Sequence, residues 1–312
     1  MSEISIITGN ANPELAKEIC EQLELSLTES LVGRFSEGEI RVKVIGNVRG
    51  KDVFIVQPTC RPVNENFMEL LILIDAVRRA SARRVTAVIP YYGYARQDRK
   101  DQPRVPITAK LVANLITSAG ADRVLTMDLH ASQIQGFFDI PVDHLYAVNT
   151  ICEYFIDKKI KDLVVVSPDV GGIKMARAYA KKMYAGLAIV DKRRDSPEKT
   201  EVMHILGNIK GKNVVLIDDI IATGSSLIEA IEELKRQGAS DVYAAVSHGV
   251  LSGDSLQRIN DSKALKEVVI TNSIPLPEPQ KNPKITVLSI APLLAEAIRR
   301  IHDEKSISCL FF

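Results

Sequence analysis

Two kinds of hydrophobic pattern alternate along the chain. Short runs rich in Val and Ile, bounded by turn residues, are typical of strands. These runs are residues 53–57, 84–90, 123–129, 163–169, 214–219, 242–248 and 268–273. Between them, apolar residues recurring at three and four positions predict helices over Met68–Ala82, Thr108–Ala119 and Ser226–Gln237. Strands that alternate with helices of this length predict an α/β protein with a mostly parallel sheet.

The pattern occurs twice. The segment GNVRGKDVFIV from Gly46 is echoed by GNIKGKNVVLI from Gly207, an offset of 207 − 46 = 161 residues. A weaker match joins ARRVTAV from Ala82 to ASDVYAA from Ala239, so the similarity includes a strand, a helix and the next strand. Chance likeness of two Gly-Lys turns is the alternative. We expect two similar halves from an internal duplication, residues 1–146 and 147–312, with the last helix a candidate for packing back on the N-terminal half.

Composition narrows the class of protein. The 312 residues are 46% hydrophobic, and 40 basic side chains balance 39 acidic ones, so no global field attracts nucleic acid or a membrane surface. The first ten residues, MSEISIITGN, show neither the basic n-region nor the apolar h-region of a signal peptide, and the longest apolar run, Leu70 to Ile74, is far too short to span a bilayer. The four scattered cysteines lack metal-ligand spacing and are expected to be free thiols. We expect a cytosolic protein that binds neither nucleic acid nor membranes.

The two copies differ where the repeated strand ends. The first continues as Gln-Pro-Thr at 57–59, whereas the second continues with Asp218 and Asp219 and then a Thr-Gly-Ser-Ser turn at 223–226 that opens a helix. Backbone N–H groups at a helix start suit a phosphate, and carboxylates accept hydrogen bonds from vicinal hydroxyls. Ligands of open α/β sheets bind beyond the carboxyl ends of the strands. The second copy therefore predicts a sugar phosphate site.

A polar surface turn is the alternative interpretation of this segment. In that case Ser225 or Ser226 would be the helix N-cap, as is common for serine. The ordered combination of the apolar strand, the acid pair and the turn favours the site. No GxGxxG motif and no Walker loop is present, so neither a dinucleotide fold nor a P-loop ATPase is indicated.

The segment VVLIDDIIATGSS resembles the phosphoribosyl-binding signature of type I phosphoribosyltransferases, and nearly the whole chain resembles the ribose-phosphate pyrophosphokinases, or PRPP synthetases. The matching blocks are GRFSEGE, PYYGYARQDRK, MDLHASQIQGFFDIPVDHL, VVSPDVGG, DKRR and LLAEAIRR. The resemblance implies two type I phosphoribosyltransferase-like halves and a Mg²⁺-dependent enzyme. That enzyme would transfer the β,γ-diphosphate of ATP to the C1 hydroxyl of ribose 5-phosphate, giving 5-phosphoribosyl 1-diphosphate and AMP.

The resemblance also implies substrate contacts. Its ATP-binding positions are Phe35, which would stack on adenine, and Glu37, Gly38, Glu39, Arg96 and Gln97. Its ribose 5-phosphate positions are Arg194, Asp218, Asp219, Ala222, Thr223, Gly224, Ser225 and Ser226. One position in each set departs from the family, which usually has Asp where this chain has Glu37 and Ala222. Taken alone, the first cluster is a turn and YYGYARQDRK an exposed loop.

Metal and catalytic roles are implied in the same way. In the family, His130 and Asp169 hold Mg²⁺, and Asp128, Asp139 and Asp143 are secondary candidates. Mg²⁺ keeps several waters, so two protein ligands suffice. The family places its catalytic Lys and Arg at Lys192 and Arg194, before a polar stretch. A closing cationic loop can neutralise charge that develops during phosphoryl transfer. The simpler interpretation of Lys192 and Arg194 is solvated charge on a loop, and that of His130 is a hydrogen-bonded structural histidine.

Assembly and regulation follow from resemblance alone. It implies a homo-oligomer, a hexamer, controlled by phosphate and ADP, with regulatory phosphate positions at Arg49, Ser81, Arg104, Ser306 and Ser308. Two other functions remain open. A phosphoribosyltransferase would use the same acid pair and turn but would leave the ATP blocks without a role. A non-catalytic regulatory homologue is disfavoured because the positions implied for catalysis and metal are retained.

Overall fold

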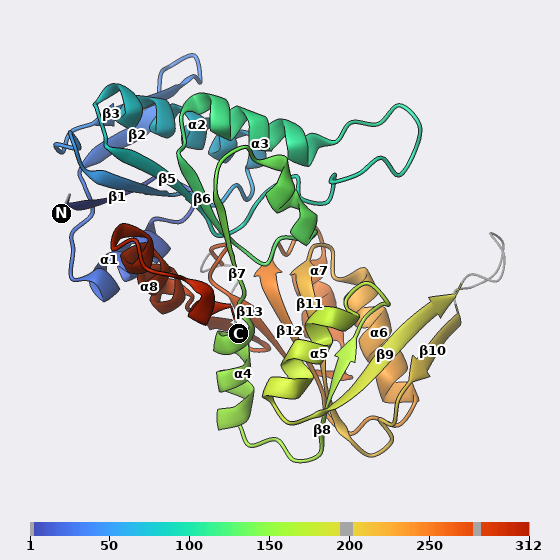
Figure 1. Cartoon of the computed structure of the whole chain (residues 1–312). Coiled ribbons are helices and arrows are strands. Elements are labelled where there is room, and N and C mark those ends of the chain that lie inside the picture. The colour runs from blue at the N-terminus through green and yellow to red at the C-terminus, as the bar shows by residue number, and fades with distance from the viewer. Residues whose placement is uncertain (1–2, 194–201, 277–281, 312) are drawn as a thin grey trace. The chain divides into compact units, whose positions relative to one another are not determined.

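The chain forms two compact units (Figure 1). The computed structural model describes residues 3–193, 202–276 and 282–311. Unit 1 contains Met1–Tyr146, Ser273–Pro275 and Ser289–Phe312, and unit 2 contains Ala147–Asn272 and Leu276–Leu288. The last helix, α8 (Ala291–His302), therefore belongs to unit 1, where it packs against α1 (Pro13–Leu23).

Unit 1 is built on a five-stranded parallel sheet with the order β1-β4-β5-β6-β7. Its strands are β1 (Ile4–Thr8), β4 (Asp52–Val56), β5 (Arg84–Ile89), β6 (Arg123–Met127) and β7 (Val142–Leu145). Every residue of β4 is buried, as expected for a central parallel strand covered on both faces. A separate hairpin joins β2 (Ser30–Arg34) and β3 (Ile40–Val44), and its inner valines pack against the core.

Helices cover this sheet. The core of unit 1 gathers buried residues of α2 (Val63–Arg79) and α3 (Thr108–Ala119) against β4 and β5. Elsewhere in the unit, His302 Nδ1 of α8 lies 3.0 Å from the buried carboxylate of Asp52, which also pairs with Arg84. Because a buried carboxylate is costly without partners, this contact fixes the end of α8 at the start of β4. Short 3₁₀ helices span Ser132–Phe137 and Ser308–Leu310.

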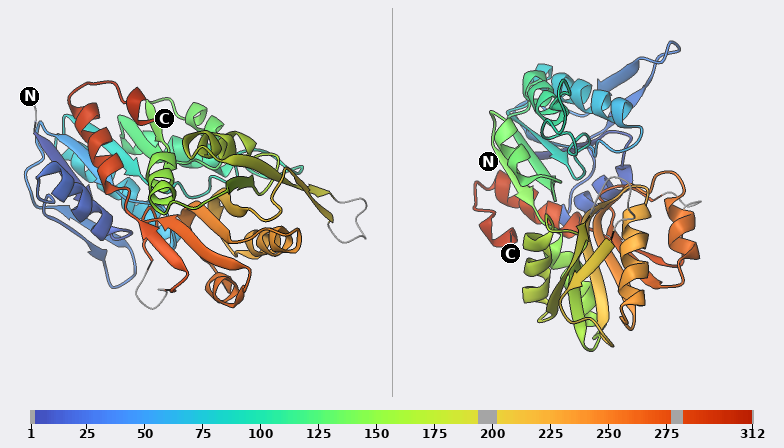
Figure 2. Two further views of the ribbon diagram at one scale, coloured as in Figure 1. Left: turned by 90° about the horizontal axis from the view of Figure 1, so that it is seen from below. Right: turned by 90° about the vertical axis from the view of Figure 1, so that its right-hand side faces the viewer.

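Unit 2 repeats the plan with two extra strands, in the order β10-β9-β8-β11-β12-β13-β14. Helices flank both faces of this sheet (Figure 2). Its parallel strands are β8 (Leu163–Ser167), β9 (Gly186–Arg193), β11 (Asn213–Ile221), β12 (Val242–Gly249), β13 (Leu265–Thr271) and β14 (Ile285–Leu288), and β10 (Val202–Leu206) is antiparallel to β9. Its helices are α4 (Val148–Asp157), α5 (Ile173–Lys182), α6 (Ser225–Arg236) and α7 (Ser255–Asp261).

The two sheets share strand order, which supports the predicted duplication. β1-β4-β5-β6-β7 corresponds to β8-β11-β12-β13-β14, and the repeated segments lead into β4 and β11. The turns before these strands match in detail, because Gly50 has φ 71° and Gly211 has φ 70°. Gly50 N donates to Ser81 O and Gly211 N to Gly238 O, at 2.9 and 2.8 Å. A left-handed turn favours glycine, which explains why both copies have it there.

Element boundaries differ from those the pattern predicts. The helix predicted at Met68–Ala82 begins earlier, at Val63, and ends at Arg79, whereas Thr108–Ala119 is a helix as predicted. β6 and β8 stop at Met127 and Ser167, so the polar residues that follow them lie in loops. In the described part of the chain no helix has the length and apolar character needed to cross a bilayer.

Candidate active site

The predicted phosphate turn lies between β11 and α6. Gly224 is the N-cap of α6, with φ 75°, so the alternative of a serine N-cap is wrong. Thr223 and Ser226 are exposed, and Thr223 Oγ1 lies 3.3 Å from Ser225 Oγ. The first-turn N–H groups of a helix have no partner within the helix, so hydroxyls and N–H groups can surround an anion here.

Backbone bonds hold this turn in place. Leu251 N donates to Ile221 O at 3.1 Å, and Ser252 N donates to Ala222 O at 2.9 Å. The loop that follows β12 therefore supports both ends of the Ile221–Ala222 peptide. The half-buried Ala222 contributes only a methyl group, where a longer acidic side chain would stand in the family.

Three carboxylates concentrate negative charge beside the turn. Burial, then the charge of Asp219, raises the pKa of Asp218 to about 8, and the nearby Asp169 adds to the effect. Asp219 N donates to Asp218 Oδ1 at 2.9 Å. β8 and β11 are neighbouring parallel strands, so their carboxyl ends share one edge of the sheet. Hydroxyl donors or a cation at this edge would stabilise the ionised form of Asp218.

Two glycines shape the loop that carries Asp169. Asp169 Oδ1 accepts a hydrogen bond from Gly172 N at 2.8 Å, and Ser167 Oγ donates to Asp169 O at 2.7 Å. A Cβ atom at Gly172 would lie 2.8 Å from Ser167 Oγ, and one at Gly171 would lie 3.2 Å from Asp169 Oδ1. Because Gly171 and Gly172 have no side chains, the loop can pass close to the exposed carboxylate of Asp169.

In unit 1, His130 is exposed in the loop that follows β6. The loop is held from β7, because Leu129 N donates to His144 Nε2 at 2.9 Å and Asp128 N donates to Leu145 O at 3.0 Å. Asp128 is buried and adopts φ 38°, a left-handed conformation that is uncommon for residues other than glycine.

The secondary metal candidates separate in the structure. Asp143 pairs with Arg123 at 2.6 Å, at the opposite end of β6 from His130, and Asp139 is exposed. Within residues 3–193, 202–276 and 282–311, no three His, Cys, Asp or Glu side chains cluster as a metal site. The assignment of Mg²⁺ to His130 and Asp169 stays a prediction, and the proximity of Asp218, Asp219 and Asp169 is the feature of unit 2 that fits a cation.

The first cluster of predicted ATP contacts forms the tip of the β2–β3 hairpin. Phe35 N donates to Glu39 O at 2.9 Å and Gly38 N donates to Phe35 O at 3.0 Å, and Gly38 has φ 97°. The Phe35 ring is 46% exposed, with Arg41 Cζ 5.5 Å from its centroid. The pKa of Glu37 is lowered, first by a hydrogen bond from the backbone N–H of Glu37 itself and then by one from the Ser36 hydroxyl. The tip thus presents an aromatic face beside two acidic side chains.

Arg96 and Gln97 lie exposed on the turn that follows β5. Gln97 is anchored to the start of α3, since its side-chain oxygen accepts from the Thr108 hydroxyl and its carbonyl accepts from Ala109 N at 3.2 Å. Of the predicted catalytic pair, Lys192 lies near the end of β9, opposite Met203 of β10, and Arg194 lies outside the described residues.

The predicted regulatory phosphate positions fall in three places. The turns that carry Arg49 and Ser81 are joined by the bond from Gly50 N to Ser81 O, at the amino ends of β4 and β5. Ser306 Oγ and Ser308 Oγ are 3.0 Å apart near the C-terminus. Arg104 is exposed in the connection that leads from β5 to α3.

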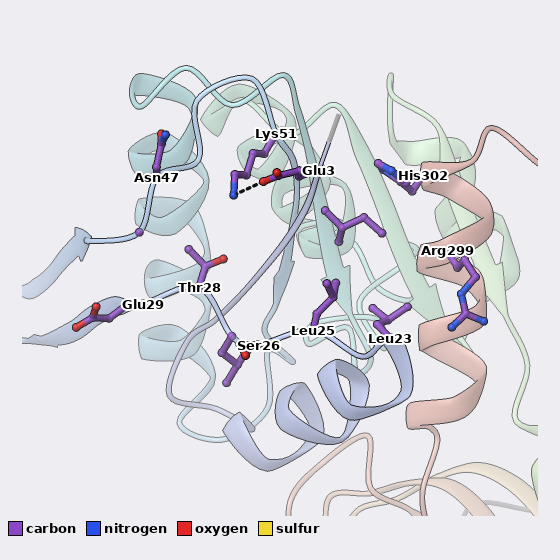
Figure 3. A pocket seen from close by; sticks show the side chains of 13 residues that line it. Glu3, Leu23, Leu25, Ser26, Thr28, Glu29, Asn47, Lys51, Arg299 and His302 are labelled. Atoms are coloured by element: carbon purple, nitrogen blue, oxygen red, sulfur yellow. Dashed lines mark ion pairs between the residues drawn. The ribbon is translucent and has the colours of Figure 1, made fainter. Parts of the chain in front are cut away.

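A pocket of about 580 Å³ in unit 1 contains none of the predicted site residues (Figure 3). It is lined by the start of β1, the connection from α1 to β2, and the end of α8, including Glu3, Lys51 and His302. It therefore lies at the amino ends of β1 and β4. Substrates of open α/β sheets bind at the opposite edge, so this pocket is not the predicted substrate site.

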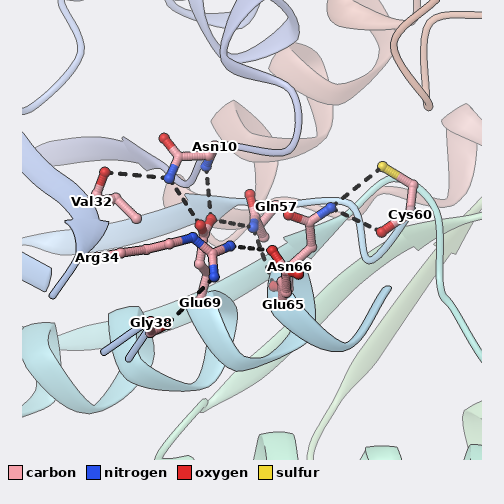
Figure 4. Close-up of polar contacts among 9 residues, drawn as sticks. All are labelled: Asn10, Val32, Arg34, Gly38, Gln57, Cys60, Glu65, Asn66 and Glu69. Atoms are coloured by element: carbon pink, nitrogen blue, oxygen red, sulfur yellow. Dashed lines mark hydrogen bonds and ion pairs between the residues drawn. The ribbon is translucent and has the colours of Figure 1, made fainter. Parts of the chain in front are cut away.

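A buried polar cluster at the carboxyl ends of β1 and β4 was missed by the sequence analysis (Figure 4). It joins Asn10, Gln57 and Glu69, of which Gln57 and Glu69 are 0% and 3% exposed. The signal in the sequence is a Glu within the apolar stripe of α2, together with a Gln at the place where the repeat has Asp218.

This arrangement defines a class of duplicated, mostly parallel α/β proteins, with candidate ligand-binding residues at the carboxyl ends of their strands. The model of the N-terminal domain of ribose phosphate pyrophosphokinase matches residues 4–120, and that of the phosphoribosyl synthetase-associated domain matches residues 193–312. The chain belongs to the ribose-phosphate pyrophosphokinase family.

Curated relatives and a solved structure agree. The ribose-phosphate pyrophosphokinase of Caldanaerobacter subterraneus is 57% identical over 99% of this chain and 98% of the relative. That of Helicobacter pylori is 53% identical over 100% of this chain and 97% of the relative. The crystal structure of phosphoribosylpyrophosphate synthetase from Mycobacterium smegmatis is 42% identical, with a TM-score of 0.91 over 97% of this chain and 100% of that chain. These matches confirm the family and the fold class that the motifs indicated.

Proposed function

We propose that this chain transfers the β,γ-diphosphate of ATP to the C1 hydroxyl of ribose 5-phosphate, producing 5-phosphoribosyl 1-diphosphate and AMP. The observation that carries the proposal is the end of β11 in a member of this family. There, an acid pair with a raised Asp218 pKa is followed, after the three residues 220–222, by a Thr-Gly-Ser-Ser turn at the start of a helix. A sugar phosphate needs both parts at this spacing.

Ribose 5-phosphate binds in unit 2. Its phosphate accepts hydrogen bonds from the N–H groups and hydroxyls of Thr223–Ser226, where the helix start also favours negative charge. Its ring hydroxyls donate to Asp218 and Asp219. Because these hydroxyls favour the ionised form of Asp218, binding near neutral pH releases protons.

ATP is bound by residues of unit 1. Adenine stacks on the exposed Phe35 ring, while Glu37 and Glu39 accept hydrogen bonds from the nucleotide. Arg96 is exposed, and its planar guanidinium can bind paired phosphate oxygens. Gln97 is held by the start of α3, which keeps its turn in place for the nucleotide.

In the transfer, the C1 oxygen of the sugar bonds to the β-phosphorus as the bond from that phosphorus to the α-phosphate oxygen breaks. The hydroxyl proton passes to solvent and AMP leaves. Positioning and charge neutralisation carry most of such a step, so no covalent intermediate is needed. Lys192 and Arg194 neutralise the charge that develops on the transferred group. Asp169 and His130 would hold Mg²⁺, which supplies charge neutralisation of the ATP phosphates when bound.

The test follows the adenine nucleotides after ATP, Mg²⁺ and ribose 5-phosphate are mixed with the protein. We expect AMP to appear in equal amount with the diphosphorylated sugar, and only when ribose 5-phosphate is present. Stoichiometric ADP without AMP would mean ordinary kinase chemistry. A protein that is inert with ATP but joins a base to the sugar of 5-phosphoribosyl 1-diphosphate would be a phosphoribosyltransferase, and complete inertness would indicate the regulatory homologue.

A cytoplasmic location and a homo-oligomeric state, a hexamer, complete the proposal. Family membership supports both, and the free state of all four cysteines fits a reducing compartment. Burial raises the pKa of Cys20 and Cys60 to about 11, so these two thiols are poorly reactive. Light scattering coupled to gel filtration measures the subunit number, and a mass of one subunit would contradict the assembly.

A further inference from the structure

Two acids of α2 hold the β2–β3 hairpin. Glu65 and Glu69 are four residues apart, so they project from the same face of the helix. Glu65 pairs with Arg34, the last residue of β2, and Glu69 bonds to Asn10, which in turn reaches Val32 (Figure 4). Besides the packing of its inner valines on the core, polar contacts therefore attach the hairpin to α2 at two points one helical turn apart.

The inner attachment is buried and well satisfied. Glu69 is 3% exposed, and its carboxylate accepts from Asn10 N at 2.9 Å, Asn10 Nδ2 at 2.9 Å and Gln57 Nε2 at 3.0 Å. Hydrogen bonds to an ionised acceptor are stronger than those between neutral groups. Asn10 Nδ2 has a second proton, which it donates to Val32 O at 3.3 Å. The position of β2 thus depends on a carboxylate fixed within α2.

The outer attachment lies directly beside the hairpin tip. Arg34 precedes Phe35, and besides its ion pair with Glu65 it approaches Gly38 O at 3.5 Å. The tip carries Phe35, Glu37 and Glu39, the nucleotide contacts of the proposed function. A hairpin alone is at best marginally stable in water, so the orientation of its tip depends on what packs against it.

We propose that Glu65 and Glu69 are positioning residues that orient the hairpin tip for adenine nucleotide, an inference that rests on the proposed function. Neither acid contacts the substrate. Both act through the strand that leads to the tip, so their loss should weaken ATP binding while the chemical step and the binding of ribose 5-phosphate are retained.

The kinetic test uses Glu65→Gln, since this side chain is 46% exposed and its loss should not unfold the protein. The matched control is Asp75→Asn, on the same helix, 51% exposed and paired with Arg79. We expect Glu65→Gln to raise KM for ATP by about threefold, the size of an exposed ion pair, with kcat and KM for ribose 5-phosphate unchanged. Asp75→Asn should match the wild type, and the exchange Arg34→Glu with Glu65→Arg should restore KM.

The second readout needs no catalysis. The chain has no tryptophan, so Phe35→Trp places a single tryptophan at the tip, which can be excited at wavelengths where the tyrosines do not absorb. In that background, Glu65→Gln should lower the fluorescence anisotropy of the tryptophan, and Asp75→Asn should not. An unchanged anisotropy, or a lowered anisotropy with unchanged KM for ATP in the Glu65→Gln protein, would overturn the proposal. If the wild type forms no AMP, the proposed function fails, and the anisotropy still reports separately whether Glu65 orients the tip.

Glu69→Gln tests the buried attachment. It replaces one acceptor oxygen with an NH₂ group, which faces Asn10 Nδ2 if it takes the place of Oε1 and faces Asn10 N and Gln57 Nε2 if it takes the place of Oε2. We therefore expect a larger rise in KM for ATP than Glu65→Gln gives, about tenfold. Circular dichroism at the assay temperature confirms that the variant is folded. Should Glu69→Gln not fold, Asn10→Ala removes the bridge from an exposed position. A folded variant of either kind with the wild-type KM for ATP would contradict the role of the inner attachment.

Discussion

The carboxyl ends of β4 and β11 occupy the same place in two copies of one plan, yet only one has an open acidic site. The offset of the repeat, 161 residues, places Gln57 opposite Asp218. Asn10 and Asp169 are also equivalent, because each comes two residues after the end of its strand, β1 or β8. In unit 2, burial and then the charge of the neighbouring Asp219 raise the pKa of Asp218 to about 8.

In unit 1 the same positions satisfy one another. Gln57 Oε1 accepts from Ala11 N at 3.2 Å while its amide donates to Glu69, an acid that stands where the repeat has the buried Ala230. A Cβ atom at Gly9 would lie 2.4 Å from Gln57 Oε1, so the side chain fills the space. The comparison teaches that two amides and one acid make a structural cluster, whereas a group of acids makes a site that is completed by its ligand.

The largest expected effect separates catalysis from folding. Lys192→Ala should lower kcat by about 10²–10³, because the charge it neutralises develops only in the transition state, with KM changed only slightly. Steady-state kinetics measures both constants. Lys210→Ala, an exposed lysine in the repeated turn of the same unit, is the matched control. A collapse of affinity with unchanged kcat would show that Lys192 binds substrate instead.

Placing an acid at position 57, directly after β4, should destabilise unit 1. Gln57→Glu keeps the shape of the side chain but sets a second buried carboxylate beside Glu69, where the wild-type atoms are 3.0 Å apart. We expect a loss of about 3 kcal/mol in the free energy of unfolding, measured by urea denaturation. The double variant Gln57→Glu with Glu69→Gln restores one acid and one amide and should recover part of the loss. Wild-type stability in the single variant would refute the structural role of the cluster.

Removing the acid Asp218 from β11 should stabilise unit 2. The folded pKa of Asp218 is raised from 3.8 to about 8, so its contribution to stability is complete below about pH 4 and is lost as the pH rises through 8. Asp218→Asn removes this loss. At pH 8.5 the ligand-free variant should melt about 2–4 °C above the wild type, and at pH 4 the difference should vanish, although activity falls. Calorimetry across this range checks the sign, and a variant less stable at pH 8.5 would contradict it.

The smallest effect concerns Ala222, where the family usually has Asp. Ala222→Asp should change KM for ribose 5-phosphate by less than about tenfold, or about 1.4 kcal/mol, because the phosphate rests on backbone N–H groups and hydroxyls that are already present. Ala222→Asn, which has the size of aspartate without its charge, is the matched control. A wild type that makes no AMP, together with an Ala222→Asp variant that does, would instead mean that this chain is a disabled member of the family.

The sequence by itself determined the fold class, the duplication and the family. Each rests on local signals. Apolar runs predict the strands, the repeated segments that begin at Gly46 and Gly207 indicate the two copies, and the ordered motifs carry the resemblance. The turn at 223–226 was also predictable, because a strand, an acid pair and a helix start are consecutive in the chain. Boundaries were less predictable, since the start of α2 at Val63 depends on packing rather than on periodicity alone.

Only the tertiary structure decided which polar residues act together. Glu69 lies in an apolar helical stripe, and nothing local shows that Asn10, 59 residues away, satisfies its carboxylate. The raised pKa of Asp218 likewise comes first from burial in the folded unit, with a further contribution from Asp169 in the loop after β8. The pairing of Asp143 with Arg123 requires the register of β6 and β7. Burial and charge are properties of a location in space, which neighbours distant in sequence create, so a pattern read along the chain cannot supply them.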